Sequence, residues 1–214
     1  RYVDGIVLRT FAHQNCLDMA EASTVPVING LSDFSHPCQA LADIFTIKEK
    51  LKKLKGITLA YVGDGNNVCN SLLFAAAKTG MNINVASPKG YSPSEEVVKF
   101  SLAIARDTGS QIKILEDPVN AVRTAQVVYT DVWASMGQEE EINKRKIIFK
   151  DFQINAKLLA SAATGILVMH CLPAHRGEEI TDDVMESKNS VVFDQAENRM
   201  HVQKAILIKL LGKD

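Results

Sequence analysis

The sequence predicts an α/β protein built on a doubly wound parallel sheet. Apolar runs of strand length alternate with segments of helical period along the 214 residues, and this alternation is typical of βαβ units. Two glycines, Gly80 and Gly109, each stand between a helical segment and the next apolar run, where a helix commonly ends. The strands are therefore expected to run parallel, with helices between them.

Each element follows from its local pattern. Strands are predicted at short apolar runs, such as Ile-Thr-Leu-Ala-Tyr-Val at 57–62, and helices where apolar residues recur every three or four positions. Ser35 is expected to cap a helix whose first turn tolerates Pro37. The predicted strands are residues 5–8, 25–28, 57–62, 82–86, 112–115, 127–129, 166–170 and 191–193. The predicted helices are residues 14–23, 36–51, 67–79, 94–108, one that begins near 118, 138–149 and 196–211.

The helix at 36–51 is predicted to carry the chain from one sheet to another. Residues 1–35 are predicted to hold two strands and one helix, and residues 1–4, Arg-Tyr-Val-Asp, lead straight into the first apolar run without an initiator methionine. We therefore expect residues 1–35 to be the end of one α/β domain. Residues 36–194 are expected to form a second, complete domain, and residues 195–214 a closing helix that returns toward the first.

Composition narrows the class of function. The chain is 46% hydrophobic and 23% charged, with a formal net charge of −1, which argues against a nucleic-acid-binding surface. No apolar stretch approaches the ~20 residues that cross a membrane. The cysteines Cys16, Cys38, Cys69 and Cys171 lie far apart without a Cys-x-x-Cys pair. This usage favours reduced thiols and a cytoplasmic location over disulfides or a zinc site.

Residues 170–173, His-Cys-Leu-Pro, are the first candidate for chemistry. An apolar run at 166–169 ends in the pair His170–Cys171, and ligands of open α/β sheets bind at the carboxyl ends of strands. A cysteine after an apolar strand is more often a small buried hydrophobe. This motif alone leaves both interpretations open.

Residues 63–67, Gly-Asp-Gly-Asn-Asn, follow a strand and open a helix. Glycines at a helix N-terminus suit an anionic ligand, and a dinucleotide is the first candidate. The dinucleotide fingerprint is broken, because Val68 replaces its third glycine and Ser87–Pro88 stand where an acidic residue would hold a ribose. The asparagine amides suit the head group of an α-amino acid, and an ordinary strand-to-helix turn is the alternative.

Two polar groups stand at other element boundaries. Asp131 and Ser135 follow the strand at 127–129 and could bind an ammonium group, although Asp131 could instead cap a turn. His36 and Gln39 share one face at the start of a helix, where they could polarise a carbonyl group. A partly exposed histidine at a helix start is the simpler alternative.

Two arginines could supply positive charge. Arg9 ends the first strand and Arg199 lies in the first turns of the last helix. Each alone is typical of a protein surface. Together they could bind an oxyanion.

These motifs together resemble one family. Residues 36–43, His-Pro-Cys-Gln-Ala-Leu-Ala-Asp, are similar to the His-Pro-x-Gln-x-Leu-Ala-Asp stretch of the aspartate/ornithine carbamoyltransferases. Residues 63–67, 131–139, 170–173 and 196–199 resemble the ornithine branch. Aspartate carbamoyltransferases carry His-Pro-Leu-Pro at 170–173, and putrescine carbamoyltransferases a different loop at 135–137. The resemblance spans the whole chain and implies a Rossmann-like ornithine-binding domain preceded by the end of a carbamoyl-phosphate-binding domain.

The resemblance implies transfer of the carbamoyl group from carbamoyl phosphate to the δ-amino group of L-ornithine, giving L-citrulline and phosphate, in arginine synthesis, the urea cycle or arginine catabolism. It implies no metal, no organic cofactor, and a homotrimer or a multiple of trimers. By position, the catalytic residues are Arg9, His36 and Cys171. The carbamoyl-phosphate contacts are Arg9, His36, Gln39, Cys171, Leu172 and Arg199. The ornithine contacts are Asn67, Asp131, Ser135 and Met136, the last through its backbone.

One family element is absent from these 214 residues. The principal carbamoyl-phosphate loop of the family reads Ser-x-Arg-Thr, and no such sequence occurs here, although Thr10 follows Arg9. We therefore expect residues 1–214 to be N-terminally truncated and inactive on their own. Two other hypotheses stay open, a non-catalytic amino-acid-binding module and a carbamoyltransferase for a related amine such as putrescine. An NAD-binding dehydrogenase domain is disfavoured by Val68 and Ser87–Pro88.

Overall fold

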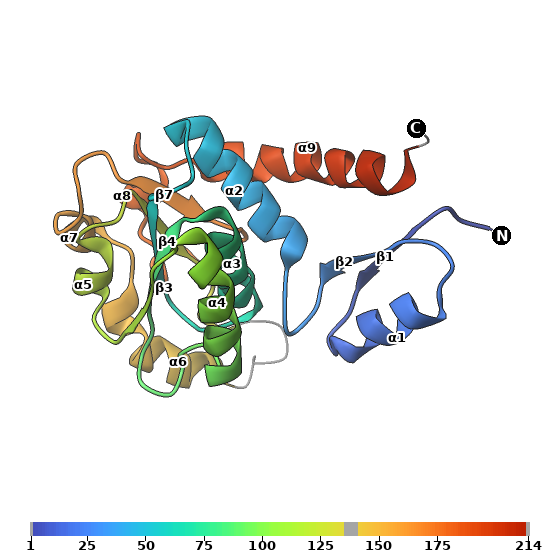
Figure 1. Cartoon of the computed structure of the whole chain (residues 1–214). Helices are drawn as coiled ribbons and strands as arrows, with labels where there is room; N and C mark the ends of the chain where they lie inside the picture. The colour runs from blue at the N-terminus through green and yellow to red at the C-terminus, as the bar shows by residue number, and fades with distance from the viewer. Residues whose placement is uncertain (1, 135–140, 213–214) are drawn as a thin grey trace.

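A computed structural model describes residues 2–134 and 141–212, and it contains two parallel sheets (Figure 1). The smaller sheet pairs β1 (Ile6–Arg9) with β2 (Val27–Leu31), and α1 (Gln14–Ala22) connects the two strands. The figure shows this unit beside the larger part of the molecule, with α2 (Pro37–Leu51) leading from one to the other. The helix thus carries the chain between the sheets.

The larger sheet has five parallel strands in the order β5-β4-β3-β6-β7. These strands are β3 (Thr58–Val62), β4 (Asn82–Ala86), β5 (Ile112–Leu115), β6 (Val127–Thr130) and β7 (Leu167–His170). The chain moves outward from β3 through β4 to β5, and then returns to the other side of β3. The predicted doubly wound parallel fold is confirmed, and its direction reverses between β3 and β6, where open α/β sheets bind ligands.

Helices cover both faces of this sheet. One face packs against α2, α3 (Asn67–Thr79) and α4 (Glu95–Thr108), and shorter helices cover the other. The remaining helical elements are α5 (Pro118–Val122), α6 (Ile142–Ile148), the 3₁₀ turn η2 (Lys150–Phe152), α7 (Ala156–Leu159), α8 (Asp182–Met185) and α9 (Val192–Leu211). Successive strand residues point to opposite faces, so Tyr61 and Val62 belong to different core clusters. Burial on both faces explains why the strands are almost continuously apolar.

The predicted ends of two helices are confirmed, and the predicted cap at the start of a third helix is wrong. Gly80 and Gly109 end α3 and α4 in the left-handed conformation, with φ of 72° and 78°, as predicted. The predicted Ser35 cap is wrong, because His36 precedes the first helical residue and no side chain caps α2. The Ser35 hydroxyl instead accepts a hydrogen bond from Asn29 Nδ2 at 3.1 Å.

The predicted strand at 191–193 is also wrong. Val192 is the first residue of α9, and only an isolated bridge between Ser190 and Val168 joins this segment to the sheet. Val191 and Val192 are apolar because they enter the two core clusters on either side of the sheet. A short buried apolar run at a helix start has the same pattern as a strand. The predicted helix at 138–149 is present as α6 from Ile142, and residues 138–140 lie outside the described part of the chain.

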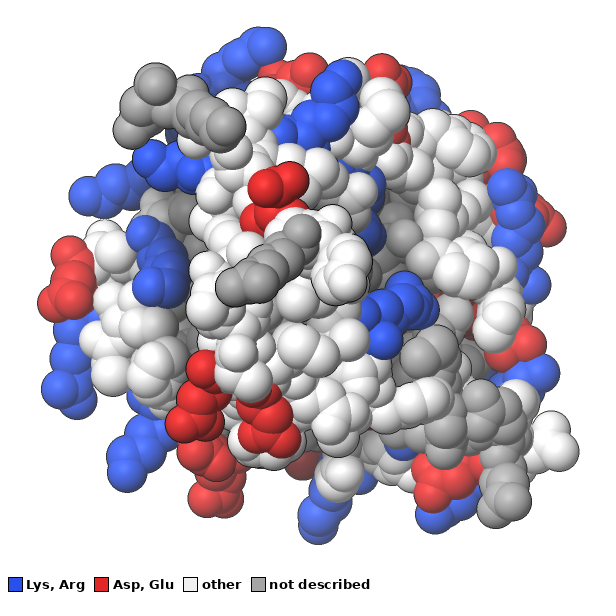
Figure 2. Space-filling view, turned by 90° about the vertical axis from the view of Figure 1, so that its right-hand side faces the viewer, with Lys and Arg blue, Asp and Glu red and all other residues white. Residues whose placement is uncertain are grey.

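The last helix bridges the two sheets. α9 packs along α2 and against β7, and its far end approaches the segment before β1, since a Cβ on Gly5 would lie 3.0 Å from Leu211 Cδ2. The face in Figure 2, on the side where β1, β2 and α1 lie, has a broad uncharged area between charged side chains. Among residues 2–134 and 141–212, no helix combines the length and hydropathy that a membrane span requires.

Candidate active site

One pocket of about 1110 Å³ lies where the carboxyl ends of strands from both sheets meet. It brings together every predicted site residue that the structure describes. These residues are Arg9, His36, Gln39, Asn67, Asp131, Cys171, Leu172 and Arg199. Ser135 and Met136 lie outside the described residues.

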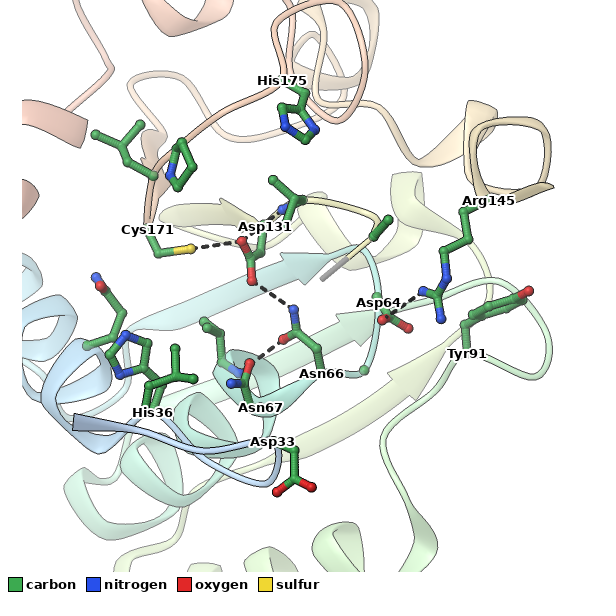
Figure 3. Close-up of a pocket in the computed structure, with 18 of the residues that line it drawn as sticks. Asp33, His36, Asp64, Asn66, Asn67, Tyr91, Asp131, Arg145, Cys171 and His175 are labelled. Atoms are coloured by element: carbon green, nitrogen blue, oxygen red, sulfur yellow. Dashed lines mark hydrogen bonds and ion pairs between the residues drawn. The ribbon is translucent and has the colours of Figure 1, made fainter. Parts of the chain in front are cut away.

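Asp131 occupies the centre of a hydrogen-bond cluster at the end of β6 (Figure 3). Its Oδ1 accepts from Val132 N at 2.8 Å and from Cys171 Sγ at 2.9 Å, and its Oδ2 accepts from Asn66 Nδ2 at 2.7 Å. Asn66 cannot turn away, because its Oδ1 caps α3 by accepting from the N–H groups of Val68 and Cys69. A helix cap therefore fixes the carboxylate that faces the pocket.

The Cys171 side chain is a neutral thiol. Burial raises its pKa well above the ordinary value, and the adjacent Asp131 raises it further. The S–H group therefore donates to Asp131 at 2.9 Å. A thiol held in this form can position a substrate but is a poor nucleophile.

His170 does not share the position of its neighbour. It is fully buried, and its Nδ1 accepts from Leu172 N at 2.9 Å while its Nε2 lies 3.0 Å from Glu179 Oε1. Of the pair predicted at this strand end, only the thiol lines the pocket. The histidine instead supports Leu172, which lines the pocket and whose φ of 57° is unfavourable for a leucine.

Asn67, which lines the pocket, connects the two sheets by a hydrogen bond. Its Nδ2 donates to Ser32 O, just after β2, at 2.7 Å. One turn further along α3, Ser71 Oγ accepts from His36 N at 2.7 Å. The ends of both sheets are therefore held in contact at the site.

A second group of pocket residues is cationic, and we call it the cationic end. Arg9 and Arg199 both line the pocket, and Arg199 Nη1 donates to Gln39 Oε1 and lies 3.4 Å from His36 Nε2. Burial lowers the pKa of His36 to about 4, and the charges of Arg199 and Arg9 act in the same direction. The imidazole is therefore neutral at pH 7, and this end presents two guanidinium groups to a ligand.

We expect His36→Asn to make the protein less sensitive to acid. The folded-state pKa of His36 is about 4, below its ordinary 6.5, so between these values the unfolded chain binds a proton that the folded protein does not. The free energy of unfolding of the wild type should therefore fall relative to the variant, by up to about 3 kcal/mol, as the pH is lowered from 7 to 4. Denaturant unfolding across this range measures the difference, with His201→Asn on the exposed side of α9 as control. A difference that stays constant with pH would contradict a buried neutral His36.

Sequence reasoning missed a second polar cluster in the pocket. Arg145 Nη1 donates to Asp64 Oδ2 at 2.9 Å and to Trp133 O at 2.8 Å, and its guanidinium lies 4.9 Å from the Tyr91 ring centroid. Burial raises the pKa of Asp64, and Arg145 opposes this shift. The pair joins β3 to the segment after β6. A carboxylate directly after a strand, in the Gly-Asp-Gly turn, was the available signal for Asp64.

The strand-to-helix turn is shaped by chain packing. A Cβ on Gly65 would lie 2.2 Å from Pro93 N and 2.4 Å from Ser92 C. The glycine is thus required by the close approach of the backbone at 92–93. This contact removes the main support for a dinucleotide-binding turn.

Within the part of the chain that the structure describes, two groups of side chains have the composition of metal ligands. The groups are Asp131, His170 and Cys171, and His175, Glu178 and Glu179. Both ring nitrogens of His170 are used within the protein, Glu178 pairs with Lys146 Nζ at 2.7 Å, and Glu179 Oε1 accepts from His175 N at 2.6 Å. Since internal partners already hold these atoms, we assign neither group to a metal.

Comparison with known proteins decides the family. Residues 55–210 match the family model described as the Asp/Orn binding domain of aspartate/ornithine carbamoyltransferase, and residues 1–49 match its carbamoyl-P binding domain. The chain belongs to the aspartate/ornithine carbamoyltransferase family. The recognised resemblance is thereby confirmed.

Several relatives of this carbamoyltransferase are named ornithine carbamoyltransferase. The ornithine carbamoyltransferase of Pyrococcus horikoshii is 57% identical over 99% of this chain, and an anabolic ornithine carbamoyltransferase of Pyrococcus furiosus is 56% identical over the same share. The chain spans 67% of the length of each of these relatives.

Solved structures agree with this assignment. The ornithine carbamoyltransferase structure from Pyrococcus furiosus superposes with a TM-score of 0.96 at 55% identity, covering 100% of this chain and 68% of that one. The Giardia lamblia ornithine transcarbamoylase superposes with a TM-score of 0.91 at 36% identity, covering 100% of this chain and 72% of that one.

Proposed function

We propose that this carbamoyltransferase moves the carbamoyl group of carbamoyl phosphate to the δ-amine of L-ornithine, giving L-citrulline and phosphate. The observation that carries the proposal is that one pocket holds two groups of side chains, a cationic group with Arg9 and Arg199 beside His36, and a hydrogen-bonded group with Asp131 and Cys171. An anionic donor and an amino-acid acceptor require two such groups. The names of the relatives agree with this pair of substrates.

The cationic end is suited to the donor. The two guanidinium groups can bind phosphate oxygens, for which arginine is the preferred partner. We propose that the neutral imidazole of His36 and the amide of Gln39, which both line the pocket, contact the carbamoyl group. Donors fixed before the reaction stabilise the negative charge that develops on the carbonyl oxygen.

The other end is suited to the α-amino acid. The Asp131 carboxylate can bind the α-ammonium group, with the amide of Asn67 near the α-carboxylate, so that the side chain extends toward Cys171 and the donor. Ser135 and Met136 are proposed to complete this end. Putrescine lacks the α-carboxylate, and aspartate would bring a second carboxylate near Asp131 and Asp64.

The reaction follows from this arrangement. The neutral δ-amine forms a C–N bond to the carbamoyl carbon, the C–O bond to phosphate breaks with its electron pair on the phosphate, and one amine proton is released to that phosphate. The neutral Cys171 thiol needs no covalent role. Holding amine and carbon in contact supplies much of the acceleration in such a transfer.

A comparison of acceptors tests the proposal. The full-length protein, meaning the natural polypeptide that contains residues 1–214, is assayed with carbamoyl phosphate and L-ornithine, putrescine or L-aspartate. We expect citrulline to form with a kcat/KM at least about 100-fold above that for either other acceptor, because a missing or repelled charged group costs several kcal/mol. Preferential carbamoylation of putrescine or aspartate would overturn the proposal, and absence of any transfer would favour a binding module.

The proposal extends to the location of the protein, its oligomeric state and its division into domains. We propose a cytoplasmic location, supported by four cysteines that are all unpaired, and a homotrimer or a multiple of trimers, supported by the family resemblance. We also propose the division into residues 1–35, 36–194 and 195–214. Sedimentation of the purified full-length protein tests the trimer.

A further inference from the structure

A buried polar network lies behind the pocket and connects its two ends. Asp43 in α2 and Gln195 in α9 are 0% and 1% exposed, and both lie behind the residues that line the pocket. Burying such groups costs free energy unless hydrogen bonds replace those to water. Their contacts therefore indicate what the network holds in place.

Asp43 receives two hydrogen bonds at one carboxylate oxygen. Its Oδ1 accepts from Gln39 Nε2 at 2.8 Å and from Gln195 Nε2 at 2.7 Å. An amide has its donors on nitrogen and its acceptor on oxygen, so an acceptor at this point fixes the orientation of both amides. The carbonyl oxygens of Gln39 and Gln195 are thereby turned toward other partners.

Each of these carbonyl oxygens holds one part of the site. Gln39 Oε1 accepts from Arg199 Nη1 at the cationic end. Gln195 Oε1 accepts from the backbone N–H of His170 at 3.0 Å, at the end of β7 directly before Cys171. One oxygen of Asp43 therefore fixes both Arg199 and the start of the Cys171 segment.

The hydrogen bonds of Asp43 are compatible with either protonation state of its carboxyl group. Burial raises the pKa of Asp43 to about 7, against the opposing effects of Gln39, Gln195, Tyr129 and Arg199. Its Oδ2 is buried without a partner among the described residues. A proton can reside on Oδ2 while Oδ1 continues to accept from both amides.

We propose that Asp43 and Gln195 are positioning residues that hold the cationic end and the thiol end of the pocket at the separation needed for carbamoyl transfer. This inference rests on the proposed function, since it assigns no substrate contact of its own. Bond formation requires the reacting atoms about 3–3.5 Å apart, and a displacement of about 1 Å can cost 100-fold in rate. A rigid connection between the two ends is a direct way to maintain that geometry.

Gln195→Met tests the connection in the full-length protein. Methionine keeps the volume but neither accepts from His170 N nor donates to Asp43, so we expect kcat/KM to fall by about 10- to 100-fold for both substrates. Asn198→Leu is the matched control. It removes another buried α2–α9 hydrogen bond, from Asn198 Nδ2 to Thr46 Oγ1 at 3.0 Å, and should lower the melting temperature with kcat/KM within about threefold of wild type.

Exchanging the carboxylate of Asp43 and the amide of Gln195 distinguishes a positioning role of these side chains from a role in packing alone. Gln195→Glu places two carboxylates together and should lose activity. In the double variant Asp43→Asn, Gln195→Glu, the asparagine nitrogen can take the position of Oδ1 and donate to the glutamate, which still accepts from His170 N. The hydrogen bond from Gln39 Nε2 to this position is lost, so the recovery is expected to be partial. We expect the double variant to recover at least about tenfold in kcat/KM over Gln195→Glu.

The outcomes distinguish the inference from the proposed function. A wild-type protein that makes no citrulline overturns the proposed function and the inference with it. An active wild type in which Gln195→Met matches the kinetics of Asn198→Leu overturns the inference alone. Should Gln195→Met fail to fold, the exchange decides, because a double variant no more active than Gln195→Glu also overturns the inference.

Discussion

A polypeptide that consists of residues 1–214 alone is expected to make no measurable citrulline. These residues supply Arg9, His36, Gln39 and Arg199 to the pocket but contain no Ser-x-Arg-Thr sequence, which in the resembling family binds the phosphate of the donor. Donors to developing negative charge are each worth roughly 10²–10³ in rate, and a loop supplies several at once. Binding energy at the phosphate also positions the carbamoyl carbon.

Adding the missing donors provides the control for this prediction. A fusion that places the Ser-x-Arg-Thr segment of a family member before residue 1 should restore turnover. We also expect the 214-residue polypeptide to associate in solution through exposed apolar side chains such as Val7, Phe11 and Ile208. Robust citrulline synthesis by that polypeptide, with its mass confirmed, would show that the contribution of the loop has been overestimated.

Asp131→Asn should raise the KM for L-ornithine by about 10- to 150-fold in the full-length protein, while the KM for carbamoyl phosphate changes by about twofold or less. The change removes one charge-assisted hydrogen bond in a pocket, worth about 1.5–3 kcal/mol. The amide also fits poorly in either orientation. Its nitrogen would face Asn66 Nδ2, which is locked by the α3 cap, or Val132 N.

Steady-state kinetics with each substrate varied in turn measures this effect. Asp33→Asn is the matched control, because Asp33 lines the same pocket and the variant loses the same charge. Within residues 2–134 and 141–212, the Asp33 carboxylate accepts one hydrogen bond, from His13 N at 2.9 Å. That variant should keep the ornithine KM within about threefold of wild type. Equal losses for both substrates in Asp131→Asn would contradict the assignment of Asp131 to the ornithine end.

The sequence alone predicts the positions of those site residues that directly follow strands of the larger sheet. Asp131 and Cys171 follow adjacent strands of a parallel sheet, so the fold class alone places them together. Asn67 opens the helix after a third strand at the same edge. Their shared position follows from topology, and three of the five motifs that carry the family resemblance, those that begin at residues 63, 131 and 170, begin at the ends of these strands.

Other features depend on contacts between distant residues and were not predicted. Arg145 donates a hydrogen bond to Asp64, 81 residues away in the sequence, and Gln195 donates one to Asp43, 152 residues away. Neither pairing leaves a local pattern, because only the packing of α6 and α9 determines it. The incorrect strand at 191–193 has the related cause that burial on two sides makes a helix start as apolar as a strand.

A crystal structure of the full-length protein with carbamoyl phosphate and L-norvaline tests the central claim most directly. L-norvaline has the α-amino-acid head group of ornithine without the δ-amine, so both ligands can occupy the pocket without reacting. We expect the α-ammonium group within about 3.2 Å of the Asp131 carboxylate, the side chain directed toward Cys171, and the phosphate near Arg9 and Arg199. An amino acid bound at the arginine end, or a phosphate bound beside Asp131, would contradict it.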